Sequence, residues 1–294
     1  MARDEAREAE VTELAERTLR DHGARALPVD PMAIAAAKDV AVRAVALPEN
    51  TFGLIMLCDG QFVIGYSDRL ENVGRKQFTI AHELGHYFID DHALALLKPG
   101  TRIHSCESGS SNNPYEKEAD LFASALLMPA RWFSETAASM PAGLKAVLEL
   151  SELCQTSITA TANRYAILSP GLCLSIISDG PVVRYGFLSA SARSLFTDGS
   201  SCFFKKRPVP PDGVTGQYDI EMKKNARQEE PADPPDGASD QRAARLKGIR
   251  LYIPKTEGSC FLSDWLPAGP RIEMREEVRI LGDYGKFTIL TGIS

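Results

Sequence analysis

The chain has 294 residues, which exceeds a typical single domain and predicts two or three folding units. Its formal net charge of −6 argues against a nucleic-acid-binding surface that runs along the whole chain. The six cysteines form neither a C-x-x-C pair nor a disulfide-like framework, and no apolar run is long enough to span a membrane. We therefore expect a cytoplasmic protein that does not enter a membrane.

The first helix is expected over residues 4–22, where apolar residues recur at helical spacing. Its inward face comprises Val11, Leu14, Ala15, Thr18 and Leu19. Gly23 ends this helix, so residues 1–27 are interpreted as an N-terminal helical segment. A short second helix is expected from Pro28 to Lys38.

Three runs of apolar and β-branched residues then predict strands, at Val40–Ala46, Phe52–Leu57 and Phe62–Tyr66. A turn at residues 58–60, which contains Asp59-Gly60, joins the last two. The sequence therefore predicts a small antiparallel sheet ahead of the next helix.

The stretch His82-Glu83-Leu84-Gly85-His86 lies inside a helix predicted over residues 78–88. Histidines four residues apart share one face of a helix, where both imidazoles can bind a single Zn²⁺. Glu83 lies beside them and is suited to act as a general base toward water. This pattern is typical of the core of a zinc peptidase.

A catalytic zinc takes three protein ligands and keeps one open position, so a third ligand is required. A helix over residues 115–128 places Glu116 and Asp120 on one face, together with small residues that permit close helix approach. Glu116 is the candidate ligand, and Asp120 can fix the tautomer of a ligand histidine through a hydrogen bond. Glu118 lies about 200° around the helix from Glu116, so it is interpreted as a rim or surface charge.

Residues 78–86 (F-T-I-A-H-E-L-G-H) and 116–129 (E-K-E-A-D-L-F-A-S-A-L-L-M-P) together resemble the ImmA/IrrE family of bacterial metallopeptidases, which are gluzincin-like. The resemblance extends over about residues 28–170. It implies an α+β, zincin-like metallopeptidase core over residues 28–130. Carried over by position, the zinc ligands fall on His82, His86 and Glu116, and the catalytic glutamate falls on Glu83.

The resemblance also implies a cofactor and a substrate. The cofactor is Zn²⁺, with Mn²⁺ as the alternative. The substrate is a helix-turn-helix transcriptional repressor of the Cro/C1 type, whose cleavage switches on stress or mobile-element genes. The peptide would add as a strand to a sheet edge beside the metal, and both Phe52–Leu57 and Phe62–Tyr66 are candidates for that edge.

The connection between the two metal-binding helices, residues 90–114, contains His92, His104 and Cys106. We expect none of them to bind the metal, because three ligands are already assigned and one position must stay open. An electrophile must polarise the scissile carbonyl. The candidates for that role are His104, Tyr87, Tyr115 and Arg102, and the sequence does not choose among them.

Residues 131–170 are interpreted as a helical segment, and residues 157–168 resemble the second helix of a helix-turn-helix. Only Lys145 and Arg164 are basic in its two helical stretches, too few to neutralise several phosphates. We therefore expect packing support or repressor docking here rather than DNA binding as the primary role.

Residues 171–294 are expected to form a β-rich C-terminal domain. Its predicted strands are Cys173–Ile177, Val182–Phe187, Ile249–Ile253, Ile272–Leu281 and Lys286–Leu290. Residues 205–247 are rich in Pro, Gly and charged residues, which predicts a poorly ordered insertion. Radiation-response members of the family carry a GAF-like sensor domain at this place, which is an analogy of fold only.

The sequence therefore predicts a zinc-dependent endopeptidase. The alternative is a non-cleaving, metal-bound regulatory or DNA-binding protein that sequesters a repressor. An intact Glu83 disfavours that alternative, because sequestration needs no general base. The sequence does not indicate an oligomeric state.

Overall fold

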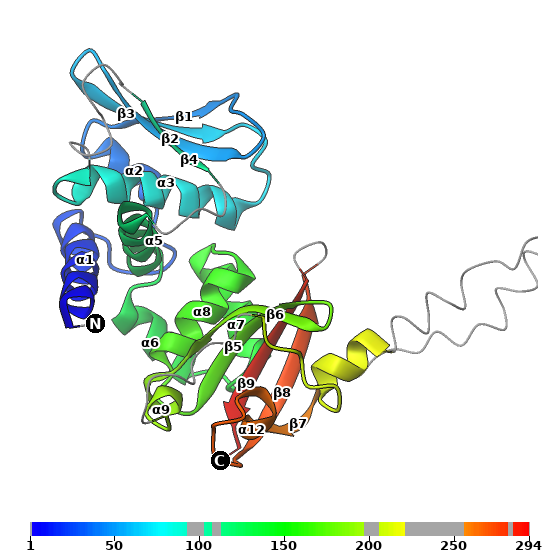
Figure 1. Cartoon of the computed structure of the whole chain (residues 1–294). Coiled ribbons are helices and arrows are strands. Elements are labelled where there is room, and N and C mark those ends of the chain that lie inside the picture. Colours follow the sequence, from blue (N-terminus) through cyan, green and yellow to red (C-terminus); the bar gives the residue numbers. More distant parts are fainter. Residues whose placement is uncertain are drawn as a thin grey trace, which may run out of the picture. The chain divides into compact units, whose positions relative to one another are not determined.

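The structure is a computed structural model with mixed α+β architecture (Figure 1). It describes residues 2–92, 103–107, 113–196, 206–220, 256–281 and 285–293. The chain divides into two compact units. The first comprises Met1–Pro141 and Lys145–Arg164, and the second comprises Ala142–Leu144 and Tyr165–Ser294. No helix in the described ranges is long and apolar enough to cross a membrane.

The first unit begins with helix α1 (Ala2–Asp21), followed by the short helix α2 (Pro31–Ala36). The predicted apolar stripe of α1 is largely buried, with Val11, Ala15 and Leu19 at most 4% exposed. Helix α2 begins after Asp30, whose side chain accepts a hydrogen bond from the backbone N–H of Met32.

A four-stranded sheet follows, in the order β1-β3-β2-β4. Its strands are β1 (Ala41–Val45), β2 (Thr51–Cys58), β3 (Gln61–Ser67) and β4 (Ile103–Glu107). Asp59 and Gly60 both have positive φ, 50° and 82°, as a two-residue hairpin turn requires. The predicted hairpin of β2 and β3 is therefore present.

The prediction of a purely antiparallel sheet is wrong, because β1 pairs with β3 in parallel. The short connection 46–50 reverses the chain between β1 and β2, and β2 is antiparallel to β3. Once β1 lies beside β3 rather than beside β2, it has to run parallel to β3. Strand β4, which the sequence analysis did not predict, is antiparallel to β2 and covers its other side.

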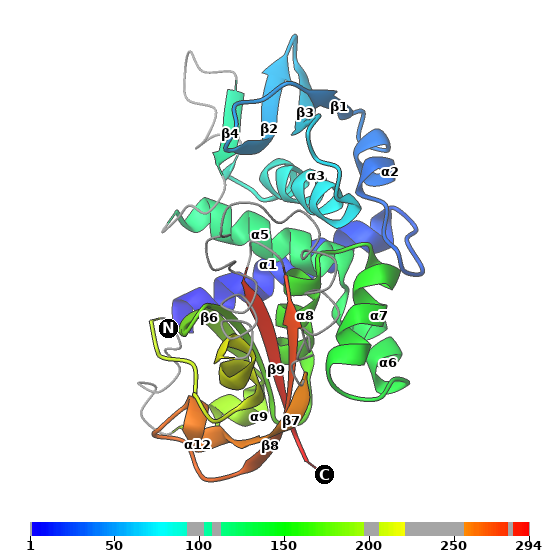
Figure 2. The same ribbon diagram turned by 90° about the vertical axis from the view of Figure 1, so that its right-hand side faces the viewer.

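Helix α3 (Val73–Phe88) lies across one face of this sheet, α5 (Pro114–Leu127) packs on α3, and α1 packs on α5 (Figures 1 and 2). Both central helices begin at asparagine caps. Asn72 accepts a hydrogen bond from the backbone N–H of Arg75, and Asn113 accepts one from that of Tyr115. The caps mark where each of the two helices starts.

Three further helices follow: α6 (Ala130–Ala138), α7 (Leu144–Cys154) and α8 (Ile158–Leu168). The turn between α7 and α8 packs on α3, since a Cβ built on Gly74 would lie 2.6 Å from the backbone carbon of Thr156. Arg164 points inward, where its Nε donates to the carbonyl of Met128 at the end of α5, and burial lowers its pKa to about 10. One of the two basic residues of this segment is thus used for packing.

The second unit contains a five-stranded antiparallel sheet in the order β6-β5-β9-β8-β7. Its strands are β5 (Cys173–Asp179), β6 (Val182–Leu188), β7 (Glu257–Phe261), β8 (Glu273–Ile280) and β9 (Lys286–Gly292). The short helices α9 (Ala190–Arg193) and α12 (Leu262–Trp265) contribute to an apolar core that includes Leu174, Met274 and Leu290. Strand β7 was not predicted from the sequence, and the strand predicted at Ile249–Ile253 lies outside the described residues.

Residues 206–220 contradict the prediction of a poorly ordered insertion over 205–247. Lys206 and Arg207 exchange backbone hydrogen bonds with Val183, and residues 214–220 are helical. The buried Glu276 accepts hydrogen bonds from the backbone N–H and the hydroxyl of Thr215, which anchors that helix to β8. The other residues of the predicted insertion lie outside the described part of the chain.

Candidate metal centre

His82 and His86 lie one turn apart on α3, with their Nε2 atoms 3.1 Å from each other. His82 is 8% exposed and His86 is fully buried. The opposite stripe of α3, which includes Ile80 and Leu84, is completely buried and fixes the rotation of the helix. The apolar pattern of the helix therefore aims both imidazoles at one point.

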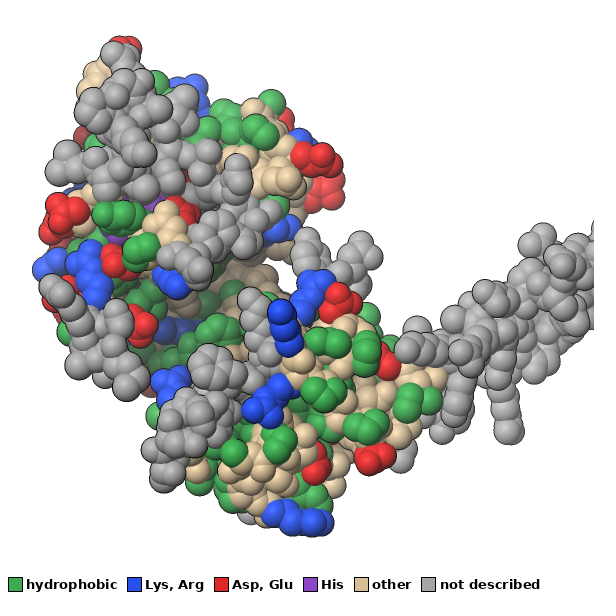
Figure 3. All heavy atoms as spheres, viewed as in Figure 1, with side chains coloured by type: hydrophobic (Ala, Val, Ile, Leu, Met, Phe, Trp, Pro, Cys, Tyr) green, Lys and Arg blue, Asp and Glu red, His purple; other side chains and the backbone are tan. Residues whose placement is uncertain are grey.

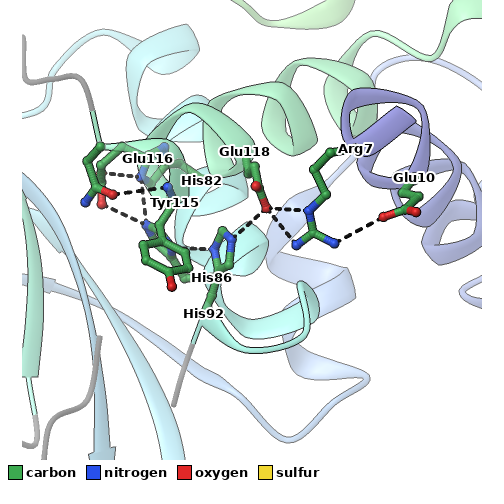
Figure 4. A network of polar contacts seen from close by, with 9 residues as sticks. Arg7, Glu10, His82, His86, His92, Tyr115, Glu116 and Glu118 are labelled. Atoms are coloured by element: carbon green, nitrogen blue, oxygen red, sulfur yellow. Dashed lines mark hydrogen bonds and ion pairs between the residues drawn. The ribbon is translucent and has the colours of Figure 1, made fainter. Parts of the chain in front are cut away.

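Glu116, in the first turn of α5, completes a group of three (Figure 4). Its carboxylate oxygens lie 3.3 Å from Nε2 of His82 and 3.5 Å from Nε2 of His86. Helices α3 and α5 approach closely, since a Cβ built on Gly85 would lie 3.0 Å from Cα of Ala119. The structure thus brings the three predicted ligands together, with one ligand atom of each within 4.8 Å of the others.

Asp120 lies one turn beyond Glu116, and its Oδ1 is 2.8 Å from Nδ1 of His82. The side chain of Asp120 is 60% exposed. A carboxylate only accepts hydrogen bonds when ionised, so this contact places the ring proton of His82 on Nδ1. The Nε2 lone pair then faces His86 and Glu116.

His86 is backed by a longer chain of contacts. Its Nδ1 lies 3.1 Å from Nδ1 of the fully buried His92, and Nε2 of His92 lies 3.1 Å from Oε2 of Glu118. Arg7 on α1 donates to the same oxygen from Nε at 3.0 Å and from Nη2 at 2.8 Å. Glu118 is therefore not the simple surface charge that was predicted, because its side chain is only 19% exposed and joins two other elements.

The charges along this chain agree with its hydrogen bonds. Burial alone would raise the pKa of Glu118, but hydrogen bonds from Arg7 and His92 outweigh it and hold that pKa below its ordinary value. Burial lowers the pKa of His92 despite the neighbouring Glu118. An ionised Glu118 beside a neutral His92 follows from both shifts.

This donor set fits a divalent cation. With the proton of His82 on Nδ1, and that of His86 on the Nδ1 that faces His92, both Nε2 lone pairs point into the same space 3.1 Å apart. The two Nε2 atoms lie 3.1 Å apart, Oε2 of Glu116 lies 3.3 Å from Nε2 of His82, and Oε1 of Glu116 lies 3.5 Å from Nε2 of His86, so each carboxylate oxygen is within ligand spacing of one imidazole. Zinc bonds of about 2.0–2.2 Å would separate neighbouring donors by roughly 3.3–3.6 Å. Two imidazoles and a carboxylate are also ordinary ligands of catalytic zinc.

Glu83 is fully buried on α3 beside this group. The backbone of β2 lies directly against it, because a Cβ built on Gly53 would collide with Oε1 of Glu83 and would lie 2.6 Å from Cγ2 of Thr79. The missing side chain at residue 53 thus gives the carboxylate its room, a relation that no local sequence pattern indicates.

The structure describes the side chains of only two of the four residues that were predicted as candidates to polarise the scissile carbonyl, Tyr115 and Tyr87. The ring of Tyr115 packs edge-on against His92, with centroids 5.0 Å apart, whereas Tyr87 packs against Phe62 and Phe88. Arg102 and the side chains of His104 and Cys106 lie outside the described residues. Which residue polarises the scissile carbonyl stays a prediction.

Neither predicted substrate strand is a sheet edge. Strand β2 pairs with β3 and β4, and β3 pairs with β1 and β2. Both strands therefore already use the two sides of their backbone. Among the described residues, β4 is the edge strand next to β2, and it pairs with another strand on one side only.

Residues 47–165 match the family model Peptidase_M78, described as the IrrE N-terminal-like domain. This part of the chain is therefore an IrrE N-terminal-like domain. No curated protein matches the chain. Among solved structures, the chain is similar to a Mycobacterium tuberculosis transcriptional regulator, with 15% identity, a TM-score of 0.56, and coverage of 97% of this chain and 76% of that one. At this identity the likeness concerns the fold alone.

The two glutamates of α5 make a direct test of the ligand assignment. Glu116→Ala is expected to weaken zinc binding by more than about 100-fold, because it removes a ligand atom. Glu118→Ala is expected still to bind one zinc per chain at saturating metal, with a smaller loss of affinity than Glu116→Ala, because Glu118 is not one of the three proposed ligands. Asp120→Ala should weaken zinc binding by about 10–100-fold. Chelator competition with each purified variant measures the affinity, and the reverse order of Glu116 and Glu118 would refute the assignment.

A Gly53→Ala substitution is expected to displace the Glu83 carboxylate, which is the movable end of a side chain. Peptidase activity should fall by about 100-fold, as misplacement of a reacting group by about 1 Å can cost. Zinc affinity should be unchanged, because the three ligand atoms are not touched. Gly171→Ala is the control, since a Cβ there meets nothing within 4 Å. Full activity of Gly53→Ala would show that Glu83 tolerates the displacement.

Proposed function

We propose that this chain is a zinc-dependent endopeptidase, with manganese as the alternative metal. The observation that carries the proposal is a fully buried carboxylate, Glu83, held beside a compact group of two imidazoles and one carboxylate. The IrrE N-terminal-like domain, a metallopeptidase family by its model, supports the same conclusion. We expect the protein to act in the cytoplasm.

The residues of the chain divide the chemistry among them. His82, His86 and Glu116 would hold a divalent ion, which supplies Lewis acidity and makes water easier to deprotonate. Glu83 would take the proton from the attacking water and later return it to the leaving amine. Its burial keeps competing water away from this transfer, and Gly53 keeps its carboxylate in place.

The backbone of β4 is the proposed docking place for substrate. An edge strand offers unpaired backbone groups, to which an extended peptide can add as a further strand. β4 is bonded to β2, the strand that borders Glu83, so a peptide there would run close to the base. Backbone pairing alone tolerates many side chains, so specificity has to come from other contacts.

The proposed substrate is a helix-turn-helix repressor of the Cro/C1 type, on the strength of the family resemblance. The similar Mycobacterium tuberculosis protein is a transcriptional regulator, which is compatible with a regulatory role for this chain. Two observations speak against DNA binding as the primary role. Arg164 is buried, and on the face shown in Figure 3 Lys and Arg side chains are dispersed among acidic and apolar ones.

The rival function is a non-cleaving metal protein that sequesters a repressor. It would need the metal group for stability only, and it would leave Glu83 without a task. Cleavage needs a general base toward water, and Glu83, next to His82 on α3, is suited to that role. Cleavage is therefore the better account of this residue.

A Glu83→Gln variant separates the two functions. The amide keeps the size of the side chain but cannot take up a proton, so cleavage should be lost while one metal per chain remains. Plasma emission measures metal content, and a gel assay with a helix-turn-helix repressor of the Cro/C1 type measures cleavage. Glu135→Gln on the exposed face of α6 is the control. Wild-type cleavage by Glu83→Gln would refute the mechanism.

Removal of residues 171–294 tests the role of the second unit. All three proposed ligands lie in the first unit, so a chain of residues 1–170 should stay soluble and hold about one metal. Cleavage without any activating signal would identify the second unit as an inhibitory sensor. Metal binding without cleavage would identify it as the part that docks substrate. Insolubility or metal loss would show that the second unit completes the peptidase fold.

A further inference from the structure

We propose that Arg7, Glu118 and His92 form a relay that positions His86 for metal binding, and that helix α1 is thereby a working part of the metal centre. The inference rests on the proposed metal site. It adds His92 and Arg7, which lie outside the two metal-binding motifs, and Arg7 precedes the matched domain at residues 47–165.

Four side chains from three separate parts of the chain are connected in sequence (Figure 4). His86 contacts His92 at 3.1 Å, His92 contacts Glu118 at 3.1 Å, and Arg7 binds Glu118 through two nitrogens at 2.8 Å and 3.0 Å. Both histidines are fully buried, whereas the side chain of Arg7 is 41% exposed. The relay thus runs from the surface of α1 to the interior.

The charged end of the relay sets the direction of every hydrogen bond. Glu118 accepts from Arg7, and as a carboxylate it can only accept from Nε2 of His92. A neutral His92 with its proton on Nε2 has a lone pair on Nδ1, which must then accept from Nδ1–H of His86. His86 is left with its Nε2 lone pair directed at His82 and Glu116, as a metal ligand requires.

The relay is more than a surface ion pair. The side chain of Arg7 is 41% exposed, and an ion pair with a solvent-exposed partner contributes little to stability by itself. The buried stripe of α1, which includes Val11 and Ala15, already holds the helix on α5. The contact of Arg7 with Glu118 therefore has an orienting effect: it keeps the carboxylate turned toward His92.

The two proposed ligand histidines differ in the partner of their Nδ1 atom. His82 is oriented by Asp120, a single carboxylate whose side chain is 60% exposed. His86 depends on two intermediate residues, one of them fully buried, before the chain of contacts reaches solvent. Disturbance of α1 should consequently reach the metal through His86.

The test compares zinc affinity and unfolding of the metal-free protein in full-length variants. Glu118→Ala and His92→Leu are expected to weaken zinc binding by about 10–100-fold, measured by chelator competition. Arg7→Met should weaken it several-fold. His92→Gln should recover part of the loss in His92→Leu, because an amide can accept from His86 and donate to Glu118. The visible absorption of the Co²⁺-loaded protein should change in the same order.

Arg20→Met is the matched control. Arg20 lies on the same helix and makes a 2.7 Å ion pair with Glu13, but neither residue belongs to the relay. Zinc affinity of this variant should equal that of the wild type. The surface position of Arg7 keeps the test valid even if the buried His92→Leu variant does not fold.

Wild-type zinc affinity in both Glu118→Ala and Arg7→Met would overturn the inference. So would a lower melting temperature of the metal-free variants without any change in affinity, because that shows a packing role only. A loss in Glu118→Ala but not in Arg7→Met would overturn the role of α1. If the wild type bound no metal, or His82→Ala bound it normally, the proposed function itself would fail. If His82→Ala lost zinc while the relay variants kept it, only the relay would fail.

Discussion

The close approach of α3 and α5 is the constraint on which the candidate metal centre depends. The two helices meet where Gly85 faces Ala119, and a Cβ on Gly85 would come within 3.0 Å of the Cα of Ala119. Because Glu116 lies one turn before Ala119, this spacing decides whether its carboxylate reaches the histidines of α3. A larger side chain at either position would separate the helices and move Glu116 away from Nε2 of both rings.

Local spacing explains why part of the centre was predictable. The four-residue separation of His82 and His86 puts them on one helical face, and the shared face of Glu116 and Asp120 follows from the same geometry. The structure brings these four side chains together, although their roles in binding remain predictions. The position of Glu118 on a different face was also correctly derived. The environment of Glu118 was not predicted, because Arg7 on α1, more than a hundred residues earlier in the chain, contacts its carboxylate.

Long-range pairing explains the remaining differences. The apolar pattern of a strand shows that it is a strand but not which neighbour it takes, so the parallel partner of β1 and the position of β4 escaped prediction. Composition misled in a similar way at residues 206–220, where backbone bonds to Val183 and the buried Glu276 provide order that the local sequence lacks. Arg164 likewise looks like a surface cation in sequence, yet its partner is the distant carbonyl of Met128.

Burial of the two proposed histidine ligands makes the hydrogen bond of their second ring nitrogen important. A buried imidazole that turns one nitrogen to a metal needs an acceptor for the proton on its other nitrogen, and an unsatisfied donor in the interior is costly. At His82 that acceptor is the exposed carboxylate of Asp120. At His86, which is fully buried, the acceptor in this chain is another buried ring, His92, and that ring donates in turn to Glu118. The series ends at the pair of Glu118 and Arg7, where the side chain of Arg7 is 41% exposed. The second histidine is therefore connected to water through a structural element outside the motif, helix α1.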